Sequence, residues 1–411
     1  MSEHTKLEDL LARGKITRRE FLARASALSA AAMLPLAFSS ENAGAAEPKK
    51  GGRLRIGCPG AQTSNSLDTA TITTLVPETL SWQLRNCLVE IDHRSQAIPE
   101  LAESWESTPD ARQWMFQLRK GVEFHHGKSL TAEDVIFSIN HHRGEDSKSP
   151  VKVIVEPITE IKADGKHTVI ITLREGNADF PYLMSDYHLA IVPNGTQGAE
   201  WEKGIGTGGY ILKSWEPGVR SFATRNPNYW KKGRAHFDAV EMIGINDPNT
   251  RTSALKTGEV DVIPRCDRKT VHLLEKSPGI QVVKTNGTKH YTIPMRSDLN
   301  PYSDRNVRLA LKHALDREHL LKAVLRGHGI LGNDHPVSPA NRYFASELPQ
   351  REYDPDKARF YLKKAGLDKH TFNLHTADAA FPGAVDVAIL YKEHAAKAGI
   401  DINVVREPND G

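Results

Sequence analysis

Glycines and histidines supply the patterns in this sequence that most resemble catalytic or cofactor-binding motifs. The segment from Gly204 to Gly209, Gly-Ile-Gly-Thr-Gly-Gly, resembles a loop that binds the phosphates of a dinucleotide. Such a loop must lead into a helix, because the N–H groups at the start of the helix bind the phosphate. Here the next residues, Tyr210 to Leu212, have the composition of a strand. The glycines therefore do not predict a nucleotide site.

Two pairs of adjacent histidines could supply metal ligands. His125 and His126 follow Phe124 in a predicted turn, whereas His141 and His142 end a predicted helix. Positive charge near a helix C-terminus is favourable by roughly 0.3–1 kcal/mol, which explains the second pair without a metal. We therefore predict no metal site at either pair.

Carboxylates do not form a recognisable catalytic group either. Glu100, Glu103 and Glu106 are spaced to share one side of a helix, and such a row usually faces solvent. The sequence contains no G-x-S-x-G, H-E-x-x-H or EF-hand motif. We predict that the protein is not an enzyme, and that it holds no metal and no cofactor.

Residues 1–46 have the organisation of an export signal. An arginine pair, Arg18 and Arg19, precedes a mildly apolar stretch from Ala25 to Phe38, and small residues at 43–46 provide a cleavage site. This stretch has fourteen residues. With a helical rise of ~1.5 Å per residue, it is too short to cross a ~30 Å hydrocarbon core. The arginine pair and the weak hydrophobicity favour the twin-arginine route, with its translocase as a partner, and hence the periplasm. The alternative is an Arg-Arg dipeptide in an ordinary amphipathic helix.

Charge and cysteine content exclude other classes of protein. The chain has 54 Lys and Arg against 51 Asp and Glu, so there is no electrostatic reason to expect nucleic acid as a partner. Cys58, Cys87 and Cys266 are too few and too scattered for a disulfide framework or a thiolate metal site. One pair could oxidise in the periplasm; the alternative is three small buried residues. No cysteine precedes Cys58 to carry a lipid anchor.

Residues 47–411 exceed one typical core, so we expect two or more lobes of mixed α/β structure. The spacing of apolar residues and turn signals predicts strands over 52–57, 166–173 and 210–212, and helices over 76–89, 131–140, 304–325 and 354–366. A strand–helix–strand unit over 372–405 implies parallel strands in the last lobe. The sequence stops directly after that unit, so we expect the C-terminal part of the last lobe to be missing.

Seven segments stand out and follow one order along the chain. They are Cys87–His93 with Pro99–Trp105, Trp114–Lys128 with Leu130–Ser138, Gly206–Gly218, Arg225–Trp230, Leu255–Val262, Val307–Arg317 and Tyr353–Arg359. Together they resemble family 5 of the extracellular solute-binding proteins, which are the peptide, nickel and opine binders of ABC importers.

The resemblance implies a periplasmic-binding-protein fold of two closing lobes plus an extra small domain. Lobe I would comprise residues 47–86 and 204–293, lobe II residues 87–203, and lobe III residues 294–411. The ligand would lie between lobes I and III, which close by a hinge motion and present a surface to the permease. In peptide binders an aspartate of lobe III pairs with the amino terminus of the peptide, and it would fall beyond Gly411. We expect a monomer.

The candidate ligand contacts lie in three places. They are the polar loop after the first strand (Ser64, Asn65, Ser66, Asp68), the glycine-rich loop (Thr207, Gly208), and the predicted strand 291–296 (Met295, Arg296). The Arg296 guanidinium suits a carboxylate or phosphate, and the alternative is an ion pair at the hinge. Asp68 is equally suited to cap a helix.

Among ligands the resemblance favours peptides, followed by opine-like conjugates and then nickel chelates. A ligand sensor or chaperone on the same fold is the remaining alternative. These expectations describe a binding protein without turnover.

Overall fold

The computed structural model describes residues 48–285, 287, 289–339, 341–367, 370–377, 380–381 and 383–407. The elements described below all lie in the unit Lys50–Gly411. The predicted signal peptide, residues 1–46, lies outside the described residues. In the part of the chain that is described, no helix is long and apolar enough to cross a membrane.

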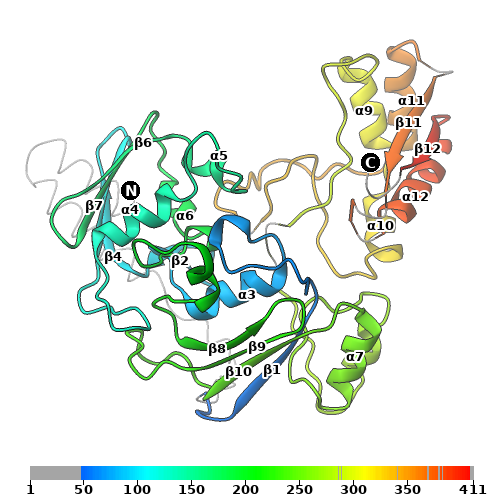
Figure 1. The fold of residues 1–411 in the computed structure, drawn as a ribbon. Coiled ribbons are helices and arrows are strands. Elements are labelled where there is room, and N and C mark those ends of the chain that lie inside the picture. The colour runs from blue at the N-terminus through cyan, green and yellow to red at the C-terminus, as the bar shows by residue number, and fades with distance from the viewer. Residues whose placement is uncertain are drawn as a thin grey trace, which may run out of the picture. The chain divides into compact units, whose positions relative to one another are not determined.

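Strands from two distant parts of the chain form the first sheet (Figure 1). Its order is β1-β10-β9-β8, with β1 parallel to β10 and the other neighbours antiparallel. Its strands are β1 (Arg53–Cys58), β8 (Tyr210–Glu216), β9 (Arg220–Arg225) and β10 (Ala239–Gly244). Ile56, Ala223 and Met242 pack with helix α3 (Leu75–Leu84) in one core. The strands predicted at 52–57 and 210–212 are thus confirmed.

The second sheet is antiparallel throughout, in the order β4-β5-β7-β6. Its strands are β4 (Ala102–Ser107), β5 (Gln113–Leu118), β6 (Ile158–Ala163) and β7 (Thr168–Leu173). Alternate residues of β5 and β7 are buried and form a core that is shared with helix α4 (Ala132–Asn140). The predicted Asp164-Gly165 turn joins β6 to β7, with Gly165 at φ +72°.

The third sheet is the parallel pair β11 (Thr371–Thr376) and β12 (Asp401–Arg406), connected by helix α12 (Ala384–Ala396). This confirms the predicted strand–helix–strand unit. Helices α9 (Arg305–His313) and α11 (Pro355–Lys364) contribute to the same core. The Asp354 side chain caps α11 by accepting a hydrogen bond from the Lys357 N–H (2.9 Å).

Shorter elements complete the described part. They are β2 (Val89–Ile91), β3 (Ala97–Pro99), α5 (Lys152–Val155), α6 (Phe180–Leu183), α7 (Pro248–Lys256), α8 (Val271–Glu275), α10 (Arg317–Ala323) and the 3-10 turns η1 (Thr69–Thr71), η2 (Tyr187–Leu189) and η3 (Gly198–Lys203). Strands β2 and β3 pair antiparallel as a fourth sheet. The first, second and third sheets draw on the segments assigned to lobes I, II and III, and the lobe boundaries stay a prediction.

Two predicted helices have wrong limits. The helix over 304–325 is two helices, because the Asp316 side chain accepts a hydrogen bond from the His319 N–H (2.9 Å) and starts α10 anew. The helix over 76–89 ends at Leu84, since Arg85 is extended and turns its guanidinium inward to the Leu67 carbonyl (2.8 Å). In both cases polar hydrogen bonding outweighs apolar spacing.

Two other predicted features are also wrong. Residues 291–296 form no strand, because none of them joins a ladder with another described segment. Glu103 and Glu106 lie on strand β4 rather than on a helix. Glu100 is buried, and its carboxylate accepts hydrogen bonds from the Asn86 side chain (2.8 Å) and the Cys87 N–H (3.0 Å).

Candidate ligand-binding region

The parallel pair β1 and β10 identifies the edge of the first sheet that is best suited to a ligand. In open α/β sheets, ligands bind beyond the carboxyl ends of the strands, where the connecting loops leave the sheet. Here those ends are Cys58 and Gly244, and we call this end of the sheet the carboxyl edge. The loop that follows β1, residues 59–74, contains four of the predicted contacts.

Asn246, which the sequence analysis missed, holds this loop. Its Oδ1 accepts hydrogen bonds from the N–H groups of Gly60 (2.9 Å) and Ala61 (3.1 Å), and its Nδ2 donates to the Ala61 carbonyl (2.8 Å). Asn65 donates to the Thr74 hydroxyl (2.8 Å) at the far end of the loop. The chain's own side chains therefore fix the shape of the loop.

Ser66 and Asp68 fasten the loop to later segments. The Ser66 hydroxyl donates to the Glu202 carboxylate (2.5 Å). Asp68 caps η1 by accepting from the Ala70 N–H (2.9 Å), and its Oδ1 lies 2.6 Å from His141 Nε2. Burial raises the pKa of Asp68, but these two hydrogen bonds and the nearby imidazoles of His141 and His142 together outweigh burial, so the pKa lies below its usual value. Asp68 is thus a cap; a ligand contact there stays a prediction.

Thr207 and Gly208 lie in the interior. Thr207 is completely buried, and its hydroxyl donates to Asn86 Oδ1 (3.0 Å). A Cβ at Gly208 would lie 2.3 Å from the Leu84 carbonyl carbon, and one at Gly206 would lie 2.2 Å from the Leu84 carbonyl oxygen. The glycines therefore let this loop pack against the end of α3, which gives the glycine pattern a structural reason.

Met295 and Arg296 belong to a separate segment. Met295 packs against the core of the third sheet. The Arg296 side chain is 72% exposed and forms a bidentate ion pair with Asp298, with contacts of 2.6 and 2.9 Å. The hydrogen bond that Arg296 donates to Asp298 raises the pKa of Arg296. A ligand carboxylate would have to compete with Asp298 for this guanidinium.

The structure thus brings Ser64, Asn65, Ser66 and Asp68 together on one loop. Ser64 is exposed, and among the described residues its hydroxyl has no hydrogen-bond partner. It is the member of this loop whose side chain is most available to a ligand.

An exposed aromatic and charged group along α3, which begins beside the carboxyl edge where Leu75 packs on Gly60, was not predicted from the sequence. Glu78 and Trp82 share one side of α3, and Trp82 is 48% exposed, with its ring centre 6.2 Å from that of Tyr187. Burial raises the pKa of Glu78, whereas the nearby Arg265 lowers it less strongly. We call Glu78, Trp82, Tyr187 and Arg265 the edge cluster. The i, i+4 spacing of Glu78 and Trp82 was the one available signal.

His188, beside the edge cluster, is fully engaged. Its Nδ1 lies 2.7 Å from Asp186 Oδ1 and its Nε2 lies 2.8 Å from the Ile72 carbonyl oxygen. Both partners are acceptors, so both ring nitrogens donate. Burial lowers the pKa of His188, but these two hydrogen bonds outweigh burial and raise it overall. Neither nitrogen is free to ligate a metal.

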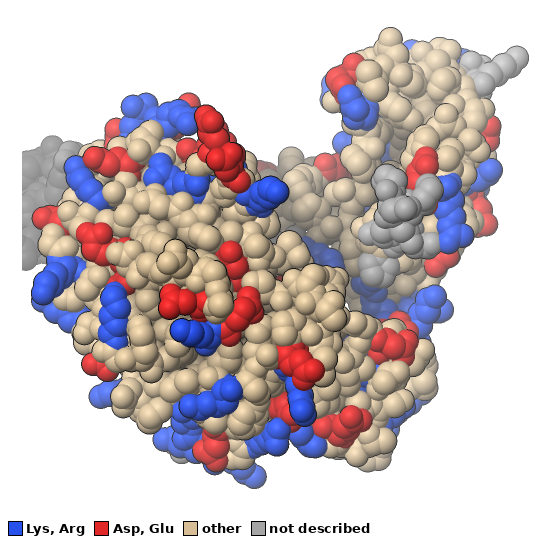
Figure 2. All heavy atoms as spheres, in the orientation of Figure 1, with Lys and Arg blue, Asp and Glu red and all other residues tan. Residues whose placement is uncertain are grey.

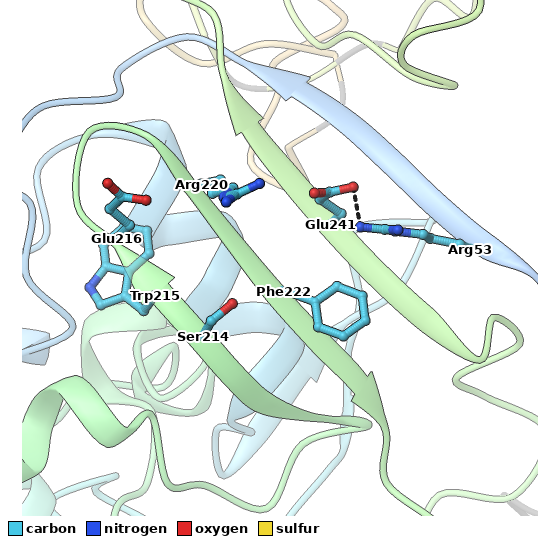
Figure 3. A pocket seen from close by; sticks show the side chains of 7 residues that line it. All are labelled: Arg53, Ser214, Trp215, Glu216, Arg220, Phe222 and Glu241. Atoms are coloured by element: carbon cyan, nitrogen blue, oxygen red, sulfur yellow. Dashed lines mark ion pairs between the residues drawn. The ribbon is translucent and has the colours of Figure 1, made fainter.

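A hollow of about 320 Å³ lies on the other face of the first sheet (Figure 3). It is lined by Arg53, Ser214, Trp215, Glu216, Arg220, Phe222 and Glu241. The Arg53 guanidinium lies 2.5 Å from the Glu241 carboxylate and 4.9 Å from the centre of the Phe222 ring. The charge of the Arg53 guanidinium is therefore already compensated. The hollow runs along this face of the sheet, and its lining residues Glu216 and Arg220 lie at the carboxyl edge, because Arg220 pairs with Ile243 beside Gly244.

Charges are interspersed on the face of the molecule that Figure 2 shows. Basic and acidic side chains alternate there without a continuous basic stripe, in keeping with the near-balanced composition. This face has no electrostatic footprint of the kind that binds nucleic acid.

Comparison with known proteins identifies relatives of this chain. The family model of bacterial extracellular solute-binding proteins, family 5 Middle, matches residues 96–410. The oligopeptide-binding protein AppA of Bacillus subtilis is 28% identical over 393 residues, which are 89% of this chain and 70% of AppA. Heme-binding protein A of Haemophilus influenzae is 28% identical over 356 residues, which are 79% of this chain and 65% of that protein.

A solved structure extends the likeness to three dimensions. The periplasmic binding protein DppA from Helicobacter pylori, in complex with the peptide STSA, is 25% identical with a TM-score of 0.67. The match covers 88% of this chain and 74% of that one. The predicted α/β fold of the periplasmic-binding-protein type is thereby confirmed. The chain spans about two thirds of the length of the curated relatives it matches.

Proposed function

Because this chain belongs to family 5 of the bacterial extracellular solute-binding proteins, we propose that it captures a peptide or peptide-like ligand for an ABC importer. The family match over residues 96–410 carries the proposal. The ligand would be enclosed as lobes I and III close, and the closed state would be the one that the permease accepts. The proposal includes no turnover of the ligand.

The edge cluster has the chemistry that a peptide requires. The Glu78 carboxylate suits an ammonium group, and the Arg265 guanidinium suits a carboxylate. Trp82 and Tyr187 offer rigid apolar surfaces for a side chain of the ligand. Ser64 and Arg296 extend the set of proposed contacts. The likeness to an oligopeptide-binding protein and to a DppA–peptide complex supports this ligand class.

An organic ligand fits the carboxyl edge better than a metal chelate does. His188 is the histidine beside the edge cluster, and both of its nitrogens are engaged. An opine-like conjugate would present the same carboxylates as a peptide and is the second candidate. The proposal also includes export through the twin-arginine translocase, with residues 1–46 as the signal, and a monomer in the periplasm.

We expect substitution of the edge cluster to weaken peptide binding measured by isothermal titration calorimetry. Trp82→Ala should raise the dissociation constant about tenfold or more, since buried aromatic contacts dominate such interfaces. Arg265→Gln should weaken binding of peptides with a free carboxyl terminus more than that of amidated peptides.

Phe360→Ala and Arg326→Gln are matched controls, because Phe360 is 60% exposed on α11 and Arg326 is an exposed arginine with positive φ like Arg265. Equal affinities for all four variants would remove the edge cluster from the site. If the unsubstituted protein binds an opine but no peptide, then opine-like conjugates rather than peptides are the ligand class.

A further inference from the structure

Asp316, His319 and His394 form a compact group of potential metal ligands in the region of the third sheet. Asp316 precedes α10, His319 lies in its first turn, and His394 lies near the end of α12. One ligand atom from each residue lies within 4.8 Å of the other two. Within the described ranges, no other three His, Cys, Asp or Glu side chains meet this closely. The two histidines are separated by 75 residues in the chain, so only the fold brings them together.

The two imidazoles face each other through their ring nitrogens. His319 Nδ1 lies 2.8 Å from His394 Nε2, and such a contact holds a single proton. The Asp316 N–H points at His394 Nδ1 (3.4 Å), which makes Nδ1 an acceptor and places the proton of His394 on Nε2. His394 therefore donates to His319, whose Nδ1 lone pair is directed at the centre of the group.

We propose that a divalent transition-metal ion binds between His319 Nδ1, His394 Nε2 and a carboxylate oxygen of Asp316. Two imidazoles and one carboxylate are a ligand set that suits zinc, nickel or copper, with water in the remaining positions. Asp316 Oδ1 caps α10 through the His319 N–H (2.9 Å), which leaves Oδ2 for the ion.

The change of geometry that the ion requires is small. With metal–nitrogen distances of about 2.0–2.1 Å in a tetrahedral site, the two nitrogens would lie about 3.3 Å apart, roughly half an ångström more than now. As the ion binds, the proton on His394 Nε2 moves to Nδ1. Nδ1 then no longer accepts the 3.4 Å hydrogen bond from the Asp316 N–H.

Burial differs across the group in a way that suits a metal site. His394 is 2% exposed, and its backbone carbonyl accepts a hydrogen bond from the Tyr353 hydroxyl (3.0 Å), so its position is fixed. His319 is exposed, so the ion can enter from solvent and the ring can adjust. The ion would tie α10 to α12.

This site is distinct from the ligand-binding region. His394 lies at the end of α12 that leads into the start of β12, whereas ligands approach parallel strands at their carboxyl ends. A metal here would stabilise the third sheet and its helices without taking part in ligand capture.

The test is a metal titration of the protein after removal of bound metal with a chelator. Zinc and nickel are each titrated in competition with a chromophoric chelator. The unsubstituted protein should bind one equivalent with an affinity that falls about tenfold or more in His319→Gln and in Asp316→Asn. Asn still caps a helix, so Asp316→Asn removes the charged ligand while α10 keeps its start.

His375→Gln is the matched control, because His375 is an exposed histidine on β11 that pairs with Glu407. Saturating metal should raise the thermal midpoint of the unsubstituted protein and of this control, but not that of His319→Gln. Unchanged metal affinity in both His319→Gln and Asp316→Asn would overturn the site. Peptide affinity should be the same in all three variants, so failure of this proposal is separable from failure of the proposed function.

Discussion

Acidification from pH 6.5 to about 4 should destabilise the protein by several kcal/mol, because two partly or fully buried histidines are held neutral. The first is His125. Its Nε2 lies 3.1 Å from the Gly208 carbonyl oxygen, and its Nδ1 accepts from the Gly206 N–H (3.3 Å). These partners specify the neutral tautomer, since a second ring proton would meet the Gly206 N–H. Burial is the main cause that lowers the pKa of His125 to about 4.

The second is His142, which is completely buried. Its Nδ1 lies 2.7 Å from the Ser149 hydroxyl, and its Nε2 lies 3.4 Å from the Thr69 hydroxyl. Burial, with His141 and His188 nearby, lowers the pKa of His142 to about 4. The sequence-based interpretation of His142 as a positive group at a helix terminus is therefore wrong; the side chain packs inward as a neutral ring.

The direction of the effect follows from proton binding. The unfolded chain takes up protons at both histidines near pH 6.5, whereas the folded chain does so only near pH 4. The stability is therefore fully present above pH 6.5 and is lost as pH falls towards 4. Each histidine contributes on the order of 2–3 kcal/mol. The raised pKa of His188 acts in the opposite sense and in a higher window, where stability is lost as pH rises.

The measurement is urea-induced unfolding between pH 4.5 and 6.5. His125→Asn and His142→Asn should each reduce the slope of unfolding free energy against pH by about 1.4 kcal/mol per pH unit, which corresponds to one proton. His126→Asn, at an exposed neighbour, is the control and should keep the original slope. A variant that lowers stability equally at every pH, with the slope intact, would show that the histidine is only a packing residue.

Replacing Asp134 by Ala should destabilise the protein by about 2–5 kcal/mol, because each buried donor that is left without an acceptor costs about 1–3 kcal/mol. The Asp134 carboxylate is completely buried and accepts from the Thr131 N–H (2.9 Å) and the Asn194 N–H (2.7 Å). It also forms an ion pair with Lys128. The substitution leaves two backbone donors unsatisfied and removes the capping box of α4.

Glu133 provides a control that separates the effect of the buried carboxylate on stability from the effect of negative charge at the start of the helix. It lies next to Asp134 in the first turn of α4 but is exposed, so Glu133→Ala should change stability by no more than about 0.5 kcal/mol. Thermal and urea unfolding of both variants would measure the difference. Equal losses in the two variants would mean that the charge at the helix start, rather than the buried network, provides the stabilisation.

Local sequence patterns predicted those parts of the fold that local interactions determine. The alternation of 166–173, the Asp164-Gly165 turn and the Thr131 helix start all correspond to observed elements. The helix over 304–325 was wrong because apolar spacing continues through Ala314 and Leu315, while the Asp316 cap decides where α10 begins.

The site was less predictable because its groups meet only in the folded chain. The edge cluster combines residues from positions 78 to 265, and the contact between Asp68 and His141 spans 73 residues. Polarity indicated four candidate ligand contacts in the loop after β1, which leaves the sheet at the carboxyl edge, and their contact with a ligand stays a prediction. It could not show that Asn65, Ser66 and Asp68 would be engaged within the chain while Trp82 would be exposed.

Native mass spectrometry of the protein purified without denaturation, and again after mild denaturation, would detect a captured ligand directly. We expect a population with added mass that is lost on denaturation and is identified by fragmentation as a peptide or peptide-like molecule. A spectrum of the bare chain alone, together with no thermal shift across a panel of peptides and opine-like conjugates, would contradict the proposed ligand capture.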